Sequence, residues 1–116
     1  SFLAQSNVLV CTVPSTPKTK GLLSKPLFDQ LTQPTYLINV ARGAVQVEKD
    51  ILEALEKNIL SGAFLDVFEE EPLPESSGLW KTDNVLIQPH LSAASPQYLE
   101  LFVEELAKRI NAGAFA

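Results

Sequence analysis

Four short apolar runs divide the chain and predict the strands of a sheet. They are Asn7–Val13, Tyr36–Val40, Ala63–Val67 and Val85–Ile87. The first run is continuously apolar and β-branched rather than alternating in polarity, which is typical of a strand buried on both faces of a parallel sheet. The segments between these runs carry helix signals, loop residues, or both.

Two helices are predicted between the strands. Ser24 and Pro26 mark a cap and a first-turn proline, and the helix they begin should reach about Leu31. Apolar residues recur at helical spacing over 47–55. Asn58 can adopt the left-handed conformation that ends this second helix.

A third and longer helix is predicted near the end of the sequence. Ser95 and Pro96 again supply a cap and a first-turn proline, and Gly113 follows the last turn. One face of this helix is an apolar stripe, formed by Leu99, Phe102, Val103, Leu106 and Ile110.

The order strand, helix, strand, helix, strand, strand, helix predicts an α/β fold. We expect a three-layer, mostly parallel sheet with right-handed crossovers. A chain of 116 residues, 46% of them hydrophobic, can form one modest core, so one domain is expected. Ligands of such sheets bind beyond the carboxyl ends of the strands.

Charge and cysteine content narrow the class of partner and the compartment. The net charge is −5 and lysines and arginines do not cluster, which argues against nucleic acid or an anionic membrane surface as a partner. No apolar stretch at the start is long enough for a signal or a membrane span. The single cysteine, Cys11, lies in an apolar run and predicts a buried side chain in a cytoplasmic protein.

Residues capable of chemistry follow the ends of different predicted strands. Arg42 offers a planar set of donors that matches a carboxylate. His90, the only histidine, can transfer a proton near neutral pH, and Glu71 could orient its ring and favour the protonated form. Together they favour carbonyl/alcohol redox chemistry on a small 2-oxo or 2-hydroxy acid.

Each of these signals has a plainer interpretation when taken alone. Arginines after strands are more often surface residues than substrate ligands. His90 fits an ordinary loop residue, and the acidic run 69–71 fits a solvated surface. Asp66 differs because it lies within an apolar run, where a carboxylate needs a partner. Trp80 is expected to anchor the loop after Asp66 to the body of the protein.

Three strings resemble successive signatures of the D-isomer-specific 2-hydroxyacid dehydrogenases. They are Asn39-Val-Ala-Arg-Gly43, Gly62-Ala-Phe-Leu-Asp-Val-Phe-Glu-Glu-Glu-Pro72 and Asn84-Val-Leu-Ile-Gln-Pro-His90. The loop 14–21 is similar to the one that precedes them in the family, and the resemblance covers essentially the whole chain in order and spacing. Within the family, the residues around Pro72, Trp80 and His90 most resemble the glyoxylate/hydroxypyruvate reductases.

The resemblance implies a role for each candidate residue. Arg42 would bind the substrate carboxylate and keto oxygen, His90 would be the acid/base, and Glu71 would support His90. Asp66 would hydrogen-bond the nicotinamide carboxamide of the cofactor. That cofactor would be NAD or NADP, with NADP favoured. Arg42 and His90 would also border this cofactor, and the backbone around three further residues would line it: Val13, Val40 and Ala41. The intact enzyme is expected to be a homodimer.

One family feature is missing from the sequence. No G-x-G-x-x-G turn is present, and only five glycines exist to build one. In the family that turn, the first mononucleotide-binding half and the substrate domain precede the segment that this chain resembles. We therefore expect the C-terminal half of a dinucleotide-binding domain, a second-half Rossmann-like unit that is inactive alone.

Two other functions stay open. Some proteins that resemble this family are cofactor-sensing corepressors, so a binding module is one alternative. The other is a structural role, because a half-sheet with an exposed edge and an uncovered helix face tends to associate.

Overall fold

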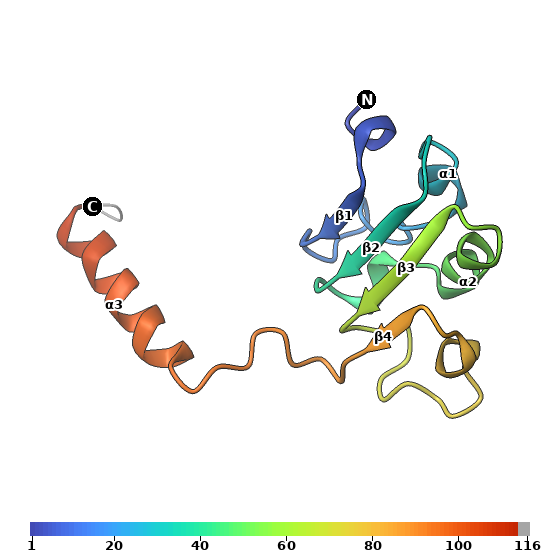
Figure 1. Ribbon diagram of the computed structural model, residues 1–116. Helices are drawn as coiled ribbons and strands as arrows, with labels where there is room; N and C mark the ends of the chain where they lie inside the picture. The colour runs from blue at the N-terminus through green and yellow to red at the C-terminus, as the bar shows by residue number, and fades with distance from the viewer. Residues whose placement is uncertain (114–116) are drawn as a thin grey trace.

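A four-stranded parallel sheet forms the centre of the protein (Figure 1). The computed structural model describes residues 1–113. Its strands, in spatial order, are β1 (Val8–Cys11), β2 (Thr35–Asn39), β3 (Leu60–Leu65) and β4 (Val85–Ile87). Every neighbouring pair is parallel, which confirms the α/β prediction.

The predicted end of the third strand was wrong for a physical reason. β3 begins at Leu60 and ends at Leu65, whereas the apolar run predicted Ala63–Val67. Val67 and Phe68 are 0% and 5% exposed although they lie in the loop beyond the strand. A loop that folds over the core carries the same apolar pattern as a strand, so the pattern alone could not place this boundary.

Two helices cover one face of the sheet. α1 (Lys25–Phe28) and α2 (Glu48–Glu56) enclose a core with β2 and β3. Its fully buried members include Phe28, Leu37, Ile51 and Leu65. α1 ends three residues before the predicted Leu31. Asn58 has a φ of 56°, which confirms the predicted left-handed stop after α2.

The opposite face of the sheet is open within residues 1–113. Four apolar residues in register, one from each strand, form a row across it: Val10, Ile38, Phe64 and Leu86. The two outer members, Val10 and Leu86, are 54% and 68% exposed. The described residues therefore form the sheet and one helical layer.

The last helix stands apart from the sheet. α3 (Tyr98–Asn111) lies beyond a long connection from β4 (Figure 1) and buries none of its residues. It begins at Tyr98 with Gln97 as its cap, so the predicted cap at Ser95 was wrong. The hydroxyl of Ser95 instead accepts a hydrogen bond from the Gln97 amide, at 3.2 Å, within the turn before the helix.

Short 3₁₀ helices complete the fold, and one of them corrects the interpretation of Trp80. They are η1 (Leu3–Gln5), η2 (Gly43–Val45) and η3 (Gly78–Lys81). In η3 the buried anchor is Leu79, 1% exposed, while Trp80 is 53% exposed and donates its indole N–H to the Pro74 carbonyl at 2.9 Å. The turn directs neighbouring side chains to different sides, so only one of the two enters the core.

Two further expectations concern the single cysteine and membrane-spanning segments. Cys11 is 5% exposed, which confirms that it is buried. No helix among residues 1–113 is long and apolar enough to cross a membrane.

Candidate active site

The centre of the candidate site is a carboxylate–imidazole pair. Glu71 Oε2 lies 2.9 Å from His90 Nδ1, and Glu71 Oε1 accepts the backbone N–H of Phe68 at 3.0 Å. The hydrogen bond from His90 holds the pKa of Glu71 below its usual value, against the opposing effect of burial. Glu71 is therefore a fixed, ionised partner for the ring and not merely part of a solvated acidic run.

His90 reaches this pair through an unusual backbone conformation. Its φ is 58°, in the left-handed region that non-glycine residues seldom adopt. The conformation persists only where surrounding contacts hold it. The His90 N–H donates to the Gln88 carbonyl at 3.0 Å, and the carboxylate of Asp66 holds the two residues that follow His90.

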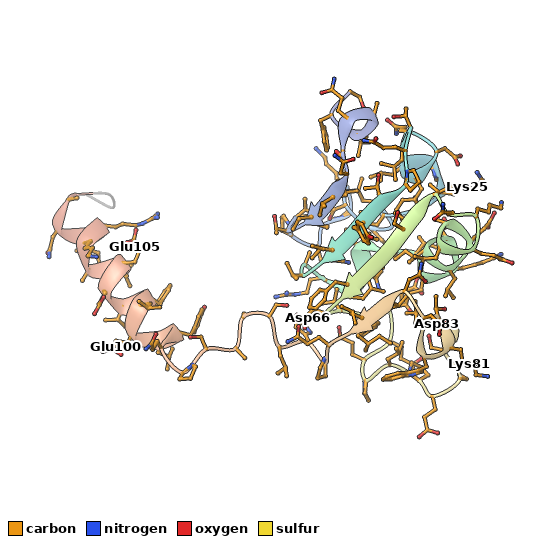
Figure 2. The ribbon with its side chains drawn as sticks, in the orientation of Figure 1. Lys25, Asp66, Lys81, Asp83, Glu100 and Glu105 are labelled. Carbon is orange, nitrogen blue, oxygen red and sulfur yellow. The ribbon has the colours of Figure 1, made fainter. Side chains whose placement is uncertain are left out.

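Asp66 is a buried carboxylate that binds the loop after His90. It is 1% exposed, and its Oδ1 and Oδ2 accept the backbone N–H groups of Leu91 at 2.7 Å and Ser92 at 3.0 Å. Burial has the largest single effect and raises its pKa, but the hydrogen bonds from the Leu91 amide and from the amide and side chain of Ser92, with a smaller effect of His90, together hold the net pKa below the ordinary value. Figure 2 shows Asp66 at the carboxyl end of β3, beside the chain that leaves β4. The prediction that Asp66 needs a partner is confirmed.

Arg42 leaves the carboxyl end of β2, on the same edge of the sheet. Its Nη1 donates to the Ala41 carbonyl at 2.7 Å, and the side chain is otherwise exposed. It makes no hydrogen bond with Glu71 or His90 among residues 1–113. The next residue, Gly43, contacts the Glu71 loop so closely that a Cβ there would lie 1.7 Å from the Phe68 carbonyl oxygen. Glycine is therefore required, and the two loops are neighbours.

The residues expected to line a cofactor lie on this edge as well. Val13 and Val40 are half-buried after β1 and β2, and Ala41 is 6% exposed. The Val40 amide bonds the Cys11 carbonyl at 3.3 Å, which joins the two strand ends. An apolar edge beside a carboxylate and an imidazole fits the nicotinamide end of a dinucleotide. The sequence holds no glycine-rich turn for its phosphates.

A pocket of about 430 Å³ lies beside the pair. Glu71 and His90 form part of its wall with apolar residues that include Phe68, Trp80 and Ile87. A more open hollow of about 860 Å³ lies between α2 and Asn84, before the start of β4. The charged side chains that line this hollow are surface lysines and glutamates, including the exposed ion pair Glu53–Lys57, so chemistry rather than volume locates the site.

Two supporting residues were not anticipated from the sequence. Asn39 and Gln46 are 0% and 1% exposed and hydrogen-bond to each other beside Arg42. Asn39 lies within an apolar run, as Asp66 does, so a polar residue inside an apolar run was the available signal. No group of three or more metal-ligating side chains gathers within residues 1–113.

The sequence matches one protein family. The family model for the D-isomer specific 2-hydroxyacid dehydrogenase, NAD binding domain, matches residues 1–92. Glyoxylate/hydroxypyruvate reductase A of Photorhabdus laumondii is 45% identical over 113 residues, which are 97% of this chain and 36% of that protein. The same enzyme of Escherichia fergusonii is 40% identical. The chain thus spans about a third of the length of these relatives.

Solved structures agree with this match. The NADPH-dependent glyoxylate/hydroxypyruvate reductase of Sinorhizobium meliloti, in complex with NADP and sulfate, superimposes with a TM-score of 0.81 at 41% identity. A probable 2-hydroxyacid dehydrogenase of Rhizobium etli, in complex with NADP, HEPES and L(+)-tartaric acid, gives 0.80 at 40% identity. Each comparison covers 97% of this chain and 37% of the other.

Proposed function

This chain belongs to the D-isomer-specific 2-hydroxyacid dehydrogenase family, and from that premise we propose that it is the catalytic half of a nucleotide-binding domain. The parent enzyme reduces a small 2-oxo acid of the glyoxylate or hydroxypyruvate type. NAD(P)H supplies the hydride, and NADP is favoured because the similar reductases named above use or bind it.

The 2.9 Å contact between Glu71 Oε2 and His90 Nδ1 carries the proposal. With Nδ1 held by a carboxylate, the other ring nitrogen, Nε2, is left without a hydrogen bond among residues 1–113. His90 is 43% exposed in its side chain, so Nε2 is accessible to a substrate oxygen. In the reaction the ring gives a proton from Nε2 to the carbonyl oxygen as reduction proceeds, and Glu71 holds the ring in place through Nδ1.

Arg42 supplies the recognition of the acid. A guanidinium has five N–H donors, and the single hydrogen bond that the Arg42 side chain makes among residues 1–113 uses Nη1. The remaining donors can bind a carboxylate in two parallel hydrogen bonds, which orients the adjacent keto group. Arg42 and His90 follow β2 and β4, which are separated only by β3, so both residues lie at the same edge of the sheet, as the binding of one small acid by both requires.

The nicotinamide end of the cofactor is assigned to the same edge. Val13, Val40 and Ala41 offer it an apolar surface, and the Asp66 carboxylate, bound to the Leu91 and Ser92 amides, lies at the same edge as the acceptor for its carboxamide. The isolated 116 residues lack a phosphate-binding turn, so we propose that they are inactive alone. The homodimer and the cytoplasmic location stay predictions.

The test compares two proteins in one assay. An intact dehydrogenase that carries this chain should oxidise NADPH in the presence of hydroxypyruvate, and the change His90→Gln should reduce its kcat by about 10²–10⁴. The isolated chain should give no hydroxypyruvate-dependent loss of NADPH absorbance. Turnover by the isolated chain would refute the proposal that it is inactive alone. An unchanged kcat in the His90→Gln enzyme would refute the proposal that His90 is the general acid.

A second candidate function is association through exposed apolar surface. The open row on the sheet and the unburied stripe of α3 favour it. Sedimentation of the isolated chain tests it, because a monomer at every concentration would rule it out. The corepressor-like alternative predicts cofactor binding by the intact protein with no reduction of keto acids.

A further inference from the structure

The side-chain amide of Gln46 makes all of its hydrogen bonds inside the protein, next to the candidate site. It lies between η2 and α2 and is 1% exposed. Its Oε1 accepts from Asn39 Nδ2 at 2.8 Å, and its Nε2 donates to the Val67 carbonyl at 3.0 Å and to Glu48 Oε2 at 3.1 Å. One acceptor and two donors are all satisfied, which fixes the orientation of the amide.

The partners of Gln46 lead in one direction to Arg42. Asn39 is the last residue of β2, and its Oδ1 accepts the Ala41 N–H at 3.0 Å. The Ala41 carbonyl in turn accepts a hydrogen bond from the Arg42 guanidinium. The turn that presents Arg42 is therefore held by the side chain that Gln46 itself holds.

In the other direction they lead to His90. The Val67 carbonyl and the Phe68 N–H belong to one peptide group, which accepts from Gln46 and donates to Glu71 Oε1. Glu71 Oε2 then contacts His90 Nδ1. Glu48 strengthens the link, because its Oε2 also accepts the Glu69 N–H at 2.5 Å. Hydrogen bonds in such a chain polarise one another, and a break at one point weakens the others.

We propose that Gln46 is a positioning residue that sets the Arg42 guanidinium relative to the Glu71–His90 pair, a role that rests on the proposed function. It touches no substrate. It acts by joining the two loops through a continuous path of hydrogen bonds, Asn39 to Gln46 to the 67–68 peptide group to Glu71 to His90.

The chemistry of the partners explains why an amide is needed. The change Gln46→Glu keeps the shape but places a carboxylate against the Val67 carbonyl and the Glu48 carboxylate, with no donor for either. Gln46→Met keeps the volume and adds no charge, but it removes the hydrogen bonds that Gln46 makes with Asn39, Glu48 and the Val67 carbonyl. Gln30→Glu makes the same charge change on the exposed surface beside α1 and serves as the matched control.

The first measurement uses the chain itself. Nitrogen NMR of the imidazole, at a pH well above the ordinary histidine value of about 6.5, reports which ring nitrogen of His90 carries the proton. The native chain and Gln30→Glu should hold it on Nδ1. In Gln46→Glu, or in Gln46→Met if the charged variant does not fold, the Nδ1-protonated share should fall by about half or more.

The second measurement uses the intact dehydrogenase and separates positioning from stability. Gln46→Met should raise the KM for hydroxypyruvate about tenfold, as expected for a misaligned charge-assisted hydrogen bond, with the KM for NADPH unchanged. Leu60→Ala removes a buried side chain at the amino end of β3 and should lower the melting temperature with both KM values unchanged.

The outcomes are distinguishable. A native tautomer in both Gln46 variants, or equal KM changes in Gln46→Met and Leu60→Ala, would show that Gln46 only stabilises the fold and would overturn the proposal. An intact native enzyme that fails to reduce hydroxypyruvate would refute the proposed function instead, and the tautomer measurement would still decide the role of Gln46.

Discussion

The two longer helices carry the same kind of sequence pattern and have different surroundings. α2 and α3 both repeat apolar residues at helical spacing, with charged residues between them. α2 buries Ile51, Ala54 and Leu55 against the sheet, whereas α3 buries no residue. In Figure 2 the α3 residues Glu100 and Glu105 lie far from the sheet.

The difference separates what periodicity determines from what it does not. A stripe of apolar residues favours a helix, but most helical stability in proteins comes from packing that stripe against another element. For α2 the partner is within the described residues. For α3 it is not, so its stripe contributes little to the stability of the chain, and single substitutions in the two helices should differ sharply.

The largest expected effect is the loss of a core side chain from α2. Ile51 is 0% exposed, and Ile51→Ala should lower the free energy of unfolding by about 2–5 kcal/mol through lost burial and the cavity left behind. Phe102 in α3 is 53% exposed and stacks mainly on Tyr98 of the same helix. Phe102→Ala should change the unfolding free energy by less than about 1 kcal/mol. Urea denaturation of the 116-residue chain measures both, and equal losses would mean that α3 packs on the body.

Two glycines give the same comparison at the level of the backbone. Gly43 allows no Cβ, because the atom would lie 1.7 Å from the Phe68 carbonyl oxygen. Gly43→Ala should cost about 3 kcal/mol, near the upper end of overpacking effects, and should separate Arg42 from the Glu71 loop. Gly113, after α3, has a φ of 80°, and within residues 1–113 no atom lies within 4 Å of the position that a Cβ would take. Gly113→Ala should strain only the end of α3 and leave the urea midpoint nearly unchanged.

The same contrast shows how far the sequence could lead. The resemblance, the succession of strands and helices along the chain, and the residues Arg42, Glu71 and His90 could be predicted from it, since apolar runs and residue types are local properties. The partners of Asp66 could not, because they are backbone amides, which every residue carries. Nor could the role of Gln46, whose three hydrogen bonds depend on the distance between two loops. Nor could the open surroundings of α3, because its apolar stripe is of the same kind as that of a packed helix.

An intermediate effect is expected at Asp66, and it depends on pH. The folded pKa of Asp66 lies below its ordinary value of 3.8, because the hydrogen bonds from Leu91 and Ser92, with a smaller effect of His90, together outweigh burial. The carboxylate therefore stabilises the fold above the unfolded pKa, and this contribution is lost as the pH falls through the folded pKa. Asp66→Asn should cost about 1–2 kcal/mol at neutral pH.

Urea midpoints from neutral pH down to acid pH check this sign. The gap between the native chain and Asp66→Asn should be largest at neutral pH and should narrow below the ordinary aspartate value of 3.8. A gap that stays constant over the whole range would mean that the carboxylate charge has no part in holding the loop after His90. A gap that widens in acid would mean that the sign is wrong.

The smallest expected effect belongs to the ion pair on α3. Glu105 Oε1 lies 2.9 Å from Arg109 Nε, and both side chains are more than half exposed. An exposed pair one helical turn apart is screened by solvent and contributes at most about 0.5 kcal/mol to its own helix. Because α3 has no contact that transmits this to the sheet among residues 1–113, Glu105→Gln should leave the global urea midpoint unchanged. Circular dichroism should instead show a slightly lower helix content. A shift of the global midpoint would mean that α3 unfolds together with the sheet, and the contrast between α2 and α3 would then be wrong.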